Sequence, residues 1–122
     1  MIIVIDFDGT VVTHDYPFIG KDIGAVPILK KLIDKDHKLI LFTMRSGQYL
    51  SDAVNWFKEN DIPLWGVNEN PQQKEWTDSP KVYGQLYIDD AALGCPLDPI
   101  HHSRPFVDWR EVKYMLKGMG II

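Results

Sequence analysis

The chain has 122 residues, of which 45% are hydrophobic and 25% charged, and its formal net charge is −4. This length and composition predict a single soluble globular domain over residues 1–122, large enough to bury one hydrophobic core. The acidic balance argues against a nucleic-acid polymer or a membrane surface as partner, because such partners usually require a basic excess. Cys95 is the only cysteine, so an internal disulfide is excluded and a reducing compartment such as the cytoplasm is expected.

Apolar runs alternate with segments of helical periodicity along the chain. The expected elements, in chain order, are a strand at 2–6, a loop or small hairpin at 11–22, a helix at 23–36, a strand at 38–44, a helix at 48–59, a strand at 64–67, a loop at 68–80, a strand at 85–88, a loop at 91–106 and a C-terminal helix. Ser46 is expected to cap the second helix.

Each expected helix carries an apolar stripe that should face the core. The stripes are Ile23, Val26, Leu29 and Ile33 in the first helix, Leu50, Ala53, Val54 and Phe57 in the second, and Trp109, Val112, Leu116 and Met119 in the third. The alternation of strands and helices predicts an α/β fold with a central parallel sheet.

Polar side chains stand where three of the apolar strands end. Asp6, Thr43 and Asp89 lie at or just after the ends of the first, second and fourth expected strands. Ligands of parallel α/β sheets bind beyond the carboxyl ends of the strands. These three residues are therefore expected to converge in space.

The acids at these strand ends indicate a cation site. Asp6 and Asp8 are one residue apart, and Asp89-Asp90 brings further negative charge to the same edge. Like charges this close need a shared proton or a cation, and oxygen ligands favour Mg²⁺. With the hydroxyl of Thr43 and the amine of Lys81, these are the parts for phosphoryl transfer through an aspartyl-phosphate.

These stretches resemble the four motifs of the haloacid dehalogenase superfamily of phosphohydrolases. VIDFDGT resembles the first motif, D-x-D-x-T/V after an apolar strand, and LILFTMRSG places Thr43 as the second. Lys81 matches the third motif and LYIDD the acidic pair of the fourth, in the family's order over residues 2–90. The resemblance implies a three-layer, Rossmann-like fold and a Mg²⁺-dependent phosphatase acting on a small phosphorylated substrate.

The resemblance also implies a role for each matching acid. Asp6 is expected to attack phosphorus and become phosphorylated. Asp8 is expected to protonate the leaving group and then activate the hydrolytic water. Asp6, the backbone carbonyl of Asp8 and Asp89 are expected to hold Mg²⁺, with Asp90 as a further ligand or as a residue that orients one.

The phosphoryl oxygens are expected to bind Thr43 and Lys81. Lys74 is an alternative to Lys81 as the motif lysine. Arg45 is expected either to contact substrate phosphate or to be a surface charge at a helix start. His14 and Asp15 lie in the expected flap at 11–22, and whether they face the site is left open.

The spacing between the motifs implies a member without a cap domain. Residues 11–22 are enough for a flap only, and residues 44–80 are already used by a helix, a strand and a loop. A sugar phosphate or a nucleotide is a candidate substrate, although Ala91 stands where nucleotide-cleaving relatives often carry Arg. A homo-oligomer that lends a lid to a neighbouring subunit is compatible with this arrangement.

Two other functions use similar residues. A receiver-like signalling domain also combines acids, Thr or Ser and Lys on a parallel sheet, but there the acidic pair comes first in the chain. A family member that binds phosphate and turns over poorly is the second alternative. The presence of both Asp6 and Asp8 favours the phosphatase over this second alternative.

Overall fold

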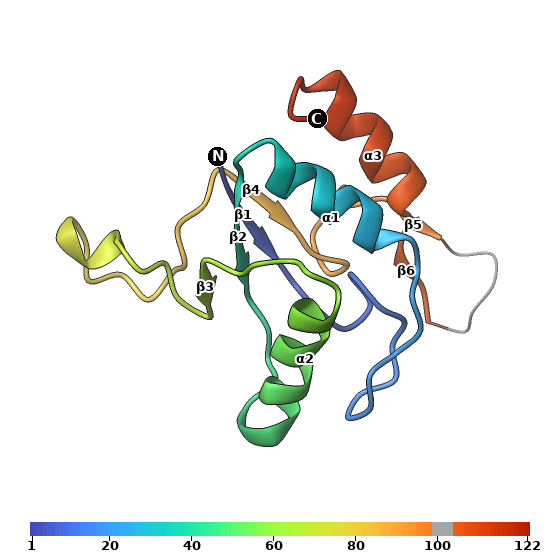
Figure 1. Ribbon diagram of the computed structural model, residues 1–122, viewed down its shortest axis with the longest axis horizontal. Helices are drawn as coiled ribbons and strands as arrows, with labels where there is room; N and C mark the ends of the chain where they lie inside the picture. Colours follow the sequence, from blue (N-terminus) through green and yellow to red (C-terminus); the bar gives the residue numbers. More distant parts are fainter. Residues whose placement is uncertain (99–103) are drawn as a thin grey trace.

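The computed structural model describes residues 1–98 and 104–122 (Figure 1). Its centre is a four-stranded parallel sheet in the order β3-β2-β1-β4, beside a two-stranded antiparallel ribbon of β5 and β6. The strands are β1 (Ile2–Ile5), β2 (Lys38–Leu41), β3 (Gly66–Val67), β4 (Leu86–Ile88), β5 (Leu97–Asp98) and β6 (Phe106–Val107); the helices are α1 (Ala25–Asp34), α2 (Gly47–Glu59), the short 3₁₀ helix η1 (Gln73–Glu75) and α3 (Trp109–Gly118). The predicted α/β fold with a central parallel sheet is confirmed.

The strand β1 is central and sets where the neighbouring strands end. Ile5 lies opposite Leu41 of β2 on one side and opposite Ile88 of β4 on the other. The three strands therefore finish level with one another. Asp6 and Asp89, the next residues along β1 and β4, leave the sheet at the same edge.

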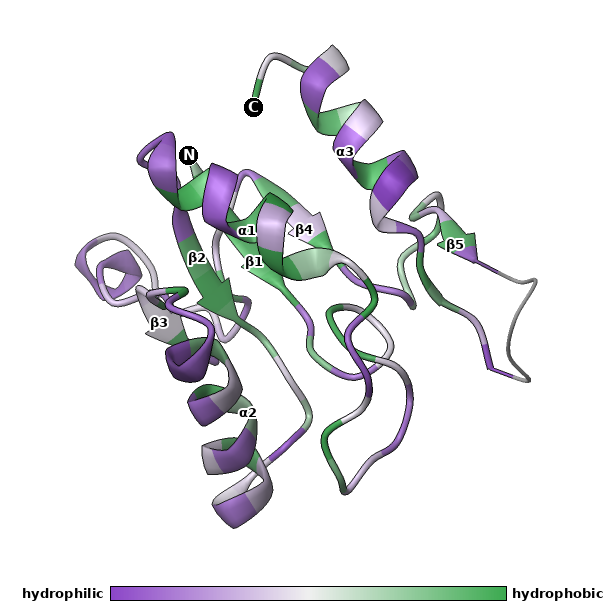
Figure 2. Cartoon of the chain, turned by 45° about the vertical axis from the view of Figure 1, so that its right-hand side comes forward, coloured by the Kyte–Doolittle hydropathy of each residue, from purple (hydrophilic) through white to green (hydrophobic). Residues whose placement is uncertain are grey.

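The two faces of the sheet are covered differently. Ile3 and Ile5 of β1 belong to the main core cluster, which includes buried residues of α1, α2 and α3; Figure 2 shows β1 in the hydrophobic colour beneath α1. Val4 faces the other way and packs with Ile40 and Val82 in a second, smaller cluster. The described helices contribute no residue to that cluster, so the expected three-layer arrangement is not confirmed.

The segment between β3 and β4 covers the second face, and buried amide side chains fasten it. Gln73 Nε2 donates to the carbonyls of Ser79 and Lys81, both at 2.9 Å, and Gln73 Oε1 accepts from the Tyr83 N–H at 2.8 Å. Asn70 Nδ2 donates to the Tyr83 carbonyl at 3.0 Å. Apart from the short helix η1, side chain–backbone hydrogen bonds hold this segment in place.

The expected buried faces are right for one helix and partly wrong for two. In α2, Ala53 and Phe57 are buried, and Leu50 and Val54 are partly buried against the same core. The buried residues of α1 are Ala25, Ile28, Leu29 and Leu32, whereas Ile23, Val26 and Ile33 are only partly buried. Both stripes of α1 contain Leu29, and packing on the sheet selects between them.

The third helix ends before the last residue of its expected stripe. Trp109, Val112 and Leu116 are buried as predicted, but Met119 is 58% exposed. Gly120 has a positive φ of 72°, and Ile121 turns back to donate to the Leu116 carbonyl. Ile121 is therefore buried in place of Met119, since the chain reverses at a glycine as helices commonly do.

The helix caps differ from one another. Ser46 occupies the N-cap position of α2, as predicted, but its side chain makes no capping hydrogen bond. Asp108 caps α3, and its carboxylate accepts from the N–H groups of Arg110 and Glu111. The α-helices are 10, 13 and 10 residues long; among the described residues none is both long and apolar enough to cross a bilayer.

Candidate functional site

The turn after β1 is built to present Asp6 and Asp8 at the edge of the sheet. Phe7, between them, is fully buried, and its carbonyl accepts from the N–H groups of Thr10 and Val11. Gly9 has φ of 75°, a conformation that side chains rarely adopt, and a Cβ there would overlap the His14 ring. The buried side chain between the acids points inward, so the two carboxylates are left at the polar edge.

The strands β1 and β4 bring three carboxylates together. One oxygen each of Asp6, Asp89 and Asp90 lies within 4.8 Å of the other two. The Thr10 hydroxyl lies 2.8 Å from Asp6 Oδ2 and 3.2 Å from Asp90 Oδ1, and it accepts from the Asp90 N–H at 3.1 Å. The sequence placed Thr10 in its first motif without giving it a role; it is the link between the two acidic segments.

The helix α3 and the strand β6 hold this turn by hydrogen bonds to its backbone. The indole N–H of Trp109 donates to the Thr10 carbonyl at 2.6 Å, in a buried hydrogen bond. The N–H of Val107 donates to the Gly9 carbonyl at 3.0 Å. The acids therefore stand on backbone fixed by a segment about a hundred residues further along the chain.

Burial raises the pKa of Asp6 from its ordinary 3.8 to about 7. The charge of Asp89 acts in the same direction, and the hydrogen bond from Thr10 opposes both. Like-charged groups gathered in a partly buried place are destabilised as carboxylates unless a cation or a proton joins them. The donor set consists of hard oxygen ligands, which suits Mg²⁺.

The flap residue His14 lies against the acid cluster. Its Nε2 is 3.0 Å from Asp90 Oδ2, and the side chain is 11% exposed. This nitrogen is buried and makes no hydrogen bond, so His14 lies beside the Asp90 carboxylate without being bonded to it. Asp15 is exposed. The structure thus brings His14 to the site and leaves Asp15 at the surface.

The carboxylate of Asp8 turns away from the other acids and binds Arg45. Asp8 Oδ2 accepts from Arg45 Nε at 2.8 Å, and Oδ1 accepts from Nη2 at 2.7 Å. The Arg45 side chain is 1% exposed, and these hydrogen bonds raise the pKa of its guanidinium. The side chain of Asp8 is therefore not among the clustered carboxylates, and only its backbone carbonyl remains for the expected metal contact.

The expected phosphate-binding role of Arg45 does not agree with its surroundings. Its remaining N–H groups donate to the carbonyls of Pro17 and Phe18 in the flap and of Tyr49 in α2. All five guanidinium N–H donors are thereby used. Arg45 is neither a surface charge nor a free phosphate ligand: it clamps the flap to Asp8.

Thr43 lies at the end of β2, as expected. Its Oγ1 accepts from the Arg45 N–H at 3.1 Å, which leaves the hydroxyl proton free to donate. Its N–H donates to Asn68 Oδ1 at 2.7 Å. Asn68 directly follows β3 and has φ of 54°, so each strand of the parallel sheet has a polar residue within two positions of its carboxyl end. The sequence-based reading missed Asn68 because it assigned this residue to the following loop.

Of the two candidate lysines, Lys81 lies over a ring that borders the cavity of the acids. Its Nζ is 5.8 Å from the centroid of the Tyr87 ring. Tyr87 lines a cavity of about 220 Å³ together with Asp6, Asp89 and the half-exposed Phe42. Lys74 instead lines a separate cavity formed by the β3–β4 segment. This placement favours Lys81 over Lys74.

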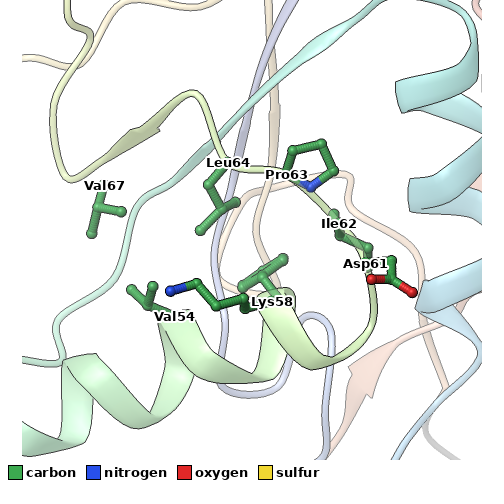
Figure 3. A pocket seen from close by; sticks show the side chains of 8 residues that line it. Val54, Lys58, Asp61, Ile62, Pro63, Leu64 and Val67 are labelled. Carbon is green, nitrogen blue, oxygen red and sulfur yellow. The ribbon is translucent and has the colours of Figure 1, made fainter.

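A cavity of about 480 Å³ lies apart from the acids, between α2 and the chain leading to β3 (Figure 3). It is lined by Val54, Phe57, Lys58, Asp61, Ile62, Pro63, Leu64 and Val67. Figure 3 shows mostly apolar side chains there, with Lys58 and Asp61 as the charged ones. None of the expected site residues lines it, so its size does not make it the candidate site.

Comparisons with known proteins identify a relative by structure. No protein-family model matches the chain, and no curated protein matches it. A solved structure of a conserved protein coded by a locus of Bacteroides thetaiotaomicron is similar over 98% of this chain and 91% of that one. The two are 34% identical in sequence, with a TM-score of 0.79.

Proposed function

Since this chain belongs to the same family as the conserved Bacteroides thetaiotaomicron protein, and this likeness assigns no activity, we propose its function from the site itself. We propose that it is a Mg²⁺-dependent phosphomonoester hydrolase that works through an aspartyl-phosphate on Asp6. One observation carries the proposal: Asp6, Asp89 and Asp90 gather within 4.8 Å at the strand ends of a parallel sheet. That is the edge where α/β sheets bind ligands.

The residues that would hold Mg²⁺ are Asp6 and Asp89 with the backbone carbonyl of Asp8, supported by Asp90. The raised pKa of Asp6 supports this assignment, because a bound cation would stabilise the carboxylate form that burial and the Asp89 charge disfavour. When bound, the cation would offset the charge of the substrate phosphate beside these carboxylates. Thr10 fixes the orientation of two of the three acids.

In the first half of the proposed reaction, a carboxylate oxygen of Asp6 attacks phosphorus. The bond between phosphorus and the leaving oxygen breaks, and Asp8 gives that oxygen a proton. The hydroxyl of Thr43 and the amine of Lys81 bind the phosphoryl oxygens. Asp8 must be protonated at this stage, so its carboxyl has to exchange part of its contact with Arg45 for the leaving group.

In the second half, a water molecule attacks the phosphorus of the aspartyl-phosphate. Asp8, now a carboxylate, accepts a proton from this water, and the bond between phosphorus and Asp6 breaks. Inorganic phosphate and the free Asp6 carboxylate result. The two hydrogen bonds from Arg45 stabilise the Asp8 carboxylate and so suit this half of the reaction.

The order of the motifs supports membership of the haloacid dehalogenase superfamily, and we propose the chain as a capless, cytoplasmic member of it. Between β1 and α1 lies only the flap, joined by the bridge of Val12 with Asp22. In this proposal the segment between β3 and β4 takes the place of the third layer. Arg45 is reassigned from phosphate ligand to clamp.

The experiment is hydrolysis of 4-nitrophenyl phosphate by the purified chain, with Mg²⁺ or with EDTA. The wild-type chain should turn over only with Mg²⁺, and Asp6→Asn should lose at least about a thousandfold in kcat. Asp34→Asn, an exposed acid at the end of α1, is the matched control and should retain activity. Equal turnover by wild type and Asp6→Asn would refute the proposal.

A second readout detects the covalent intermediate. Borohydride reduces an acyl phosphate to an alcohol, so quenching during turnover should convert Asp6 to homoserine, which peptide mass spectrometry identifies. Phosphate binding without turnover or reduction at Asp6 would instead support the phosphate-binding module. A stable phosphorylated Asp6 that is not hydrolysed would support the receiver-like switch.

A further inference from the structure

Three exposed aromatic side chains surround the clamp that holds Asp8. Phe18 is 71% exposed, Tyr16 58% and Tyr49 45%. Tyr16 and Phe18 lie in the flap, and Tyr49 lies in the first turn of α2. Single exposed aromatic side chains are common on proteins, but a group of them on two neighbouring segments is typical of a binding surface.

Arg45 fixes the geometry of this aromatic rim, by which we mean Tyr16, Phe18 and Tyr49. Its guanidinium donates to the carbonyls of Phe18 and Tyr49, and it lies 5.1 Å from the centroid of the Tyr16 ring. The Tyr16 and Tyr49 rings contact edge to face, with centroids 5.6 Å apart. The rim is therefore preorganised on a buried side chain.

The position of the rim relative to Asp8 indicates its occupant. The same guanidinium nitrogen of Arg45 donates to the Asp8 carboxylate and to the Phe18 carbonyl, both at 2.7 Å. Asp8 is the residue that would meet the leaving oxygen, so the group attached to that oxygen has to lie on the Asp8 side of the phosphate. Arg45 has no N–H left to bind a second anionic group there.

We propose that the aromatic rim is the leaving-group subsite and that it takes a flat, apolar group, such as an aromatic ring bonded to the leaving oxygen. This inference rests on the proposed phosphatase function and adds the class of its substrate. Contact with the exposed aromatic side chains stabilises such a group, and a fixed rim loses little conformational freedom on binding. Strongly polar leaving groups gain nothing from these contacts.

The test compares two phosphonates that cannot be hydrolysed, so that its readout does not depend on turnover. Calorimetry with Mg²⁺ would give the dissociation constants of benzylphosphonate and methylphosphonate. The wild-type chain should bind benzylphosphonate about tenfold more tightly. That preference should fall to about twofold or less in Phe18→Ala and in Tyr49→Ala. Tyr114→Ala, an aromatic side chain 78% exposed on α3, should keep the wild-type preference.

The outcomes separate this inference from the proposed function. Binding of both phosphonates without a benzyl preference, or a preference that Phe18→Ala leaves intact, would overturn the inference alone. Failure of both phosphonates to bind would overturn the phosphate site and the inference with it. Light scattering at the same concentrations tests whether a second copy of the chain occupies the rim. A dimer that Phe18→Ala dissociates would make the rim an interface between copies and overturn the inference.

Discussion

Thr10 and Asp90 are 80 positions apart in the chain, and the Thr10 hydroxyl joins them. The hydroxyl accepts a hydrogen bond from the Asp90 N–H at 3.1 Å. It also donates one to Asp6 Oδ2, with 2.8 Å between the two oxygens. One hydroxyl therefore sets the spacing between the acids of β1 and β4. Groups that orient metal ligands affect metal affinity even though they do not bind the metal.

We expect Thr10→Val to weaken Mg²⁺ binding by about tenfold or more, because the valine keeps the shape and loses the hydroxyl. Thr10→Ser keeps the hydroxyl and should stay within about threefold of wild type. Titration calorimetry with MgCl₂ measures both. Unchanged affinity in Thr10→Val would show that the acids need no such link.

The clamp at Arg45 should be a main source of stability for the flap. Arg45→Ala leaves Asp8 and the carbonyls of Pro17 and Phe18 without their donors, so we expect a loss of about 3 kcal/mol in the free energy of unfolding. Arg110→Ala is the control: its side chain is 84% exposed and lies 3.5 Å from Asp108, and it should cost less than about 0.5 kcal/mol. Urea unfolding of the two variants checks the contrast, and similar losses would contradict it.

The raised pKa of Asp6 predicts that the metal-free protein loses stability as the pH rises. Between about pH 4 and pH 7 the unfolded chain has released the Asp6 proton, whereas the folded chain, with a pKa of about 7, still holds it. The free energy of unfolding therefore falls across this window and is level above it. Asp6 contributes at most a few kcal/mol to this fall, from the size of the shift.

Urea unfolding of wild type and Asp6→Asn in EDTA, at pH 5 and pH 8, measures the contribution of Asp6 together with its coupling to Asp89, since acids distant from Asp6 cancel in the difference. Wild type should lose stability relative to Asp6→Asn between the two pH values. Added Mg²⁺ should restore wild type at pH 8, where Asp6 is a carboxylate, more than at pH 5. A difference between the proteins that does not change with pH would contradict the prediction.

The two helix caps offer a contrast within one chain. Asp108→Ala removes a carboxylate that accepts two backbone N–H groups at the start of α3, so we expect a loss of about 1 kcal/mol in the free energy of unfolding. Ser46 holds the same position in α2 without a side-chain hydrogen bond. Ser46→Ala should therefore change stability by less than about 0.3 kcal/mol. Thermal unfolding followed by circular dichroism compares them, and equal losses would contradict the assignment.

The meeting of the acids is predictable from sequence because parallel strands carry their ends to one edge. Asp6 and Asp89 each follow an apolar run, and the register of β1 with β4 places them as expected. The choice between Lys81 and Lys74 is not predictable in this way. It depends on how the segment between β3 and β4 lies on the sheet, and side chain–backbone hydrogen bonds of Gln73 and Asn70 decide that.

The role of Arg45 cannot be predicted from the sequence, for a related reason. Three of its hydrogen-bond partners are backbone carbonyls, of Pro17, Phe18 and Tyr49, and every residue has a carbonyl. Sequence patterns mark side-chain chemistry, so a residue that binds backbone leaves no partner to recognise. The buried stripe of α1 is similarly undetermined, because two overlapping apolar stripes share Leu29 and packing on the sheet separates them.

The two faces of the sheet are covered differently, and this affects which part of the molecule unfolds locally. The segment over Val4 and Ile40 adds one buried apolar residue, Val82, to that face and is otherwise fastened by the amides of Asn70 and Gln73. Segments with few apolar contacts exchange their amide hydrogens through local openings that cost less than global unfolding. Lys81 belongs to this segment, so such an opening would displace its amine from the Tyr87 ring while β1, β2 and the helices stay folded.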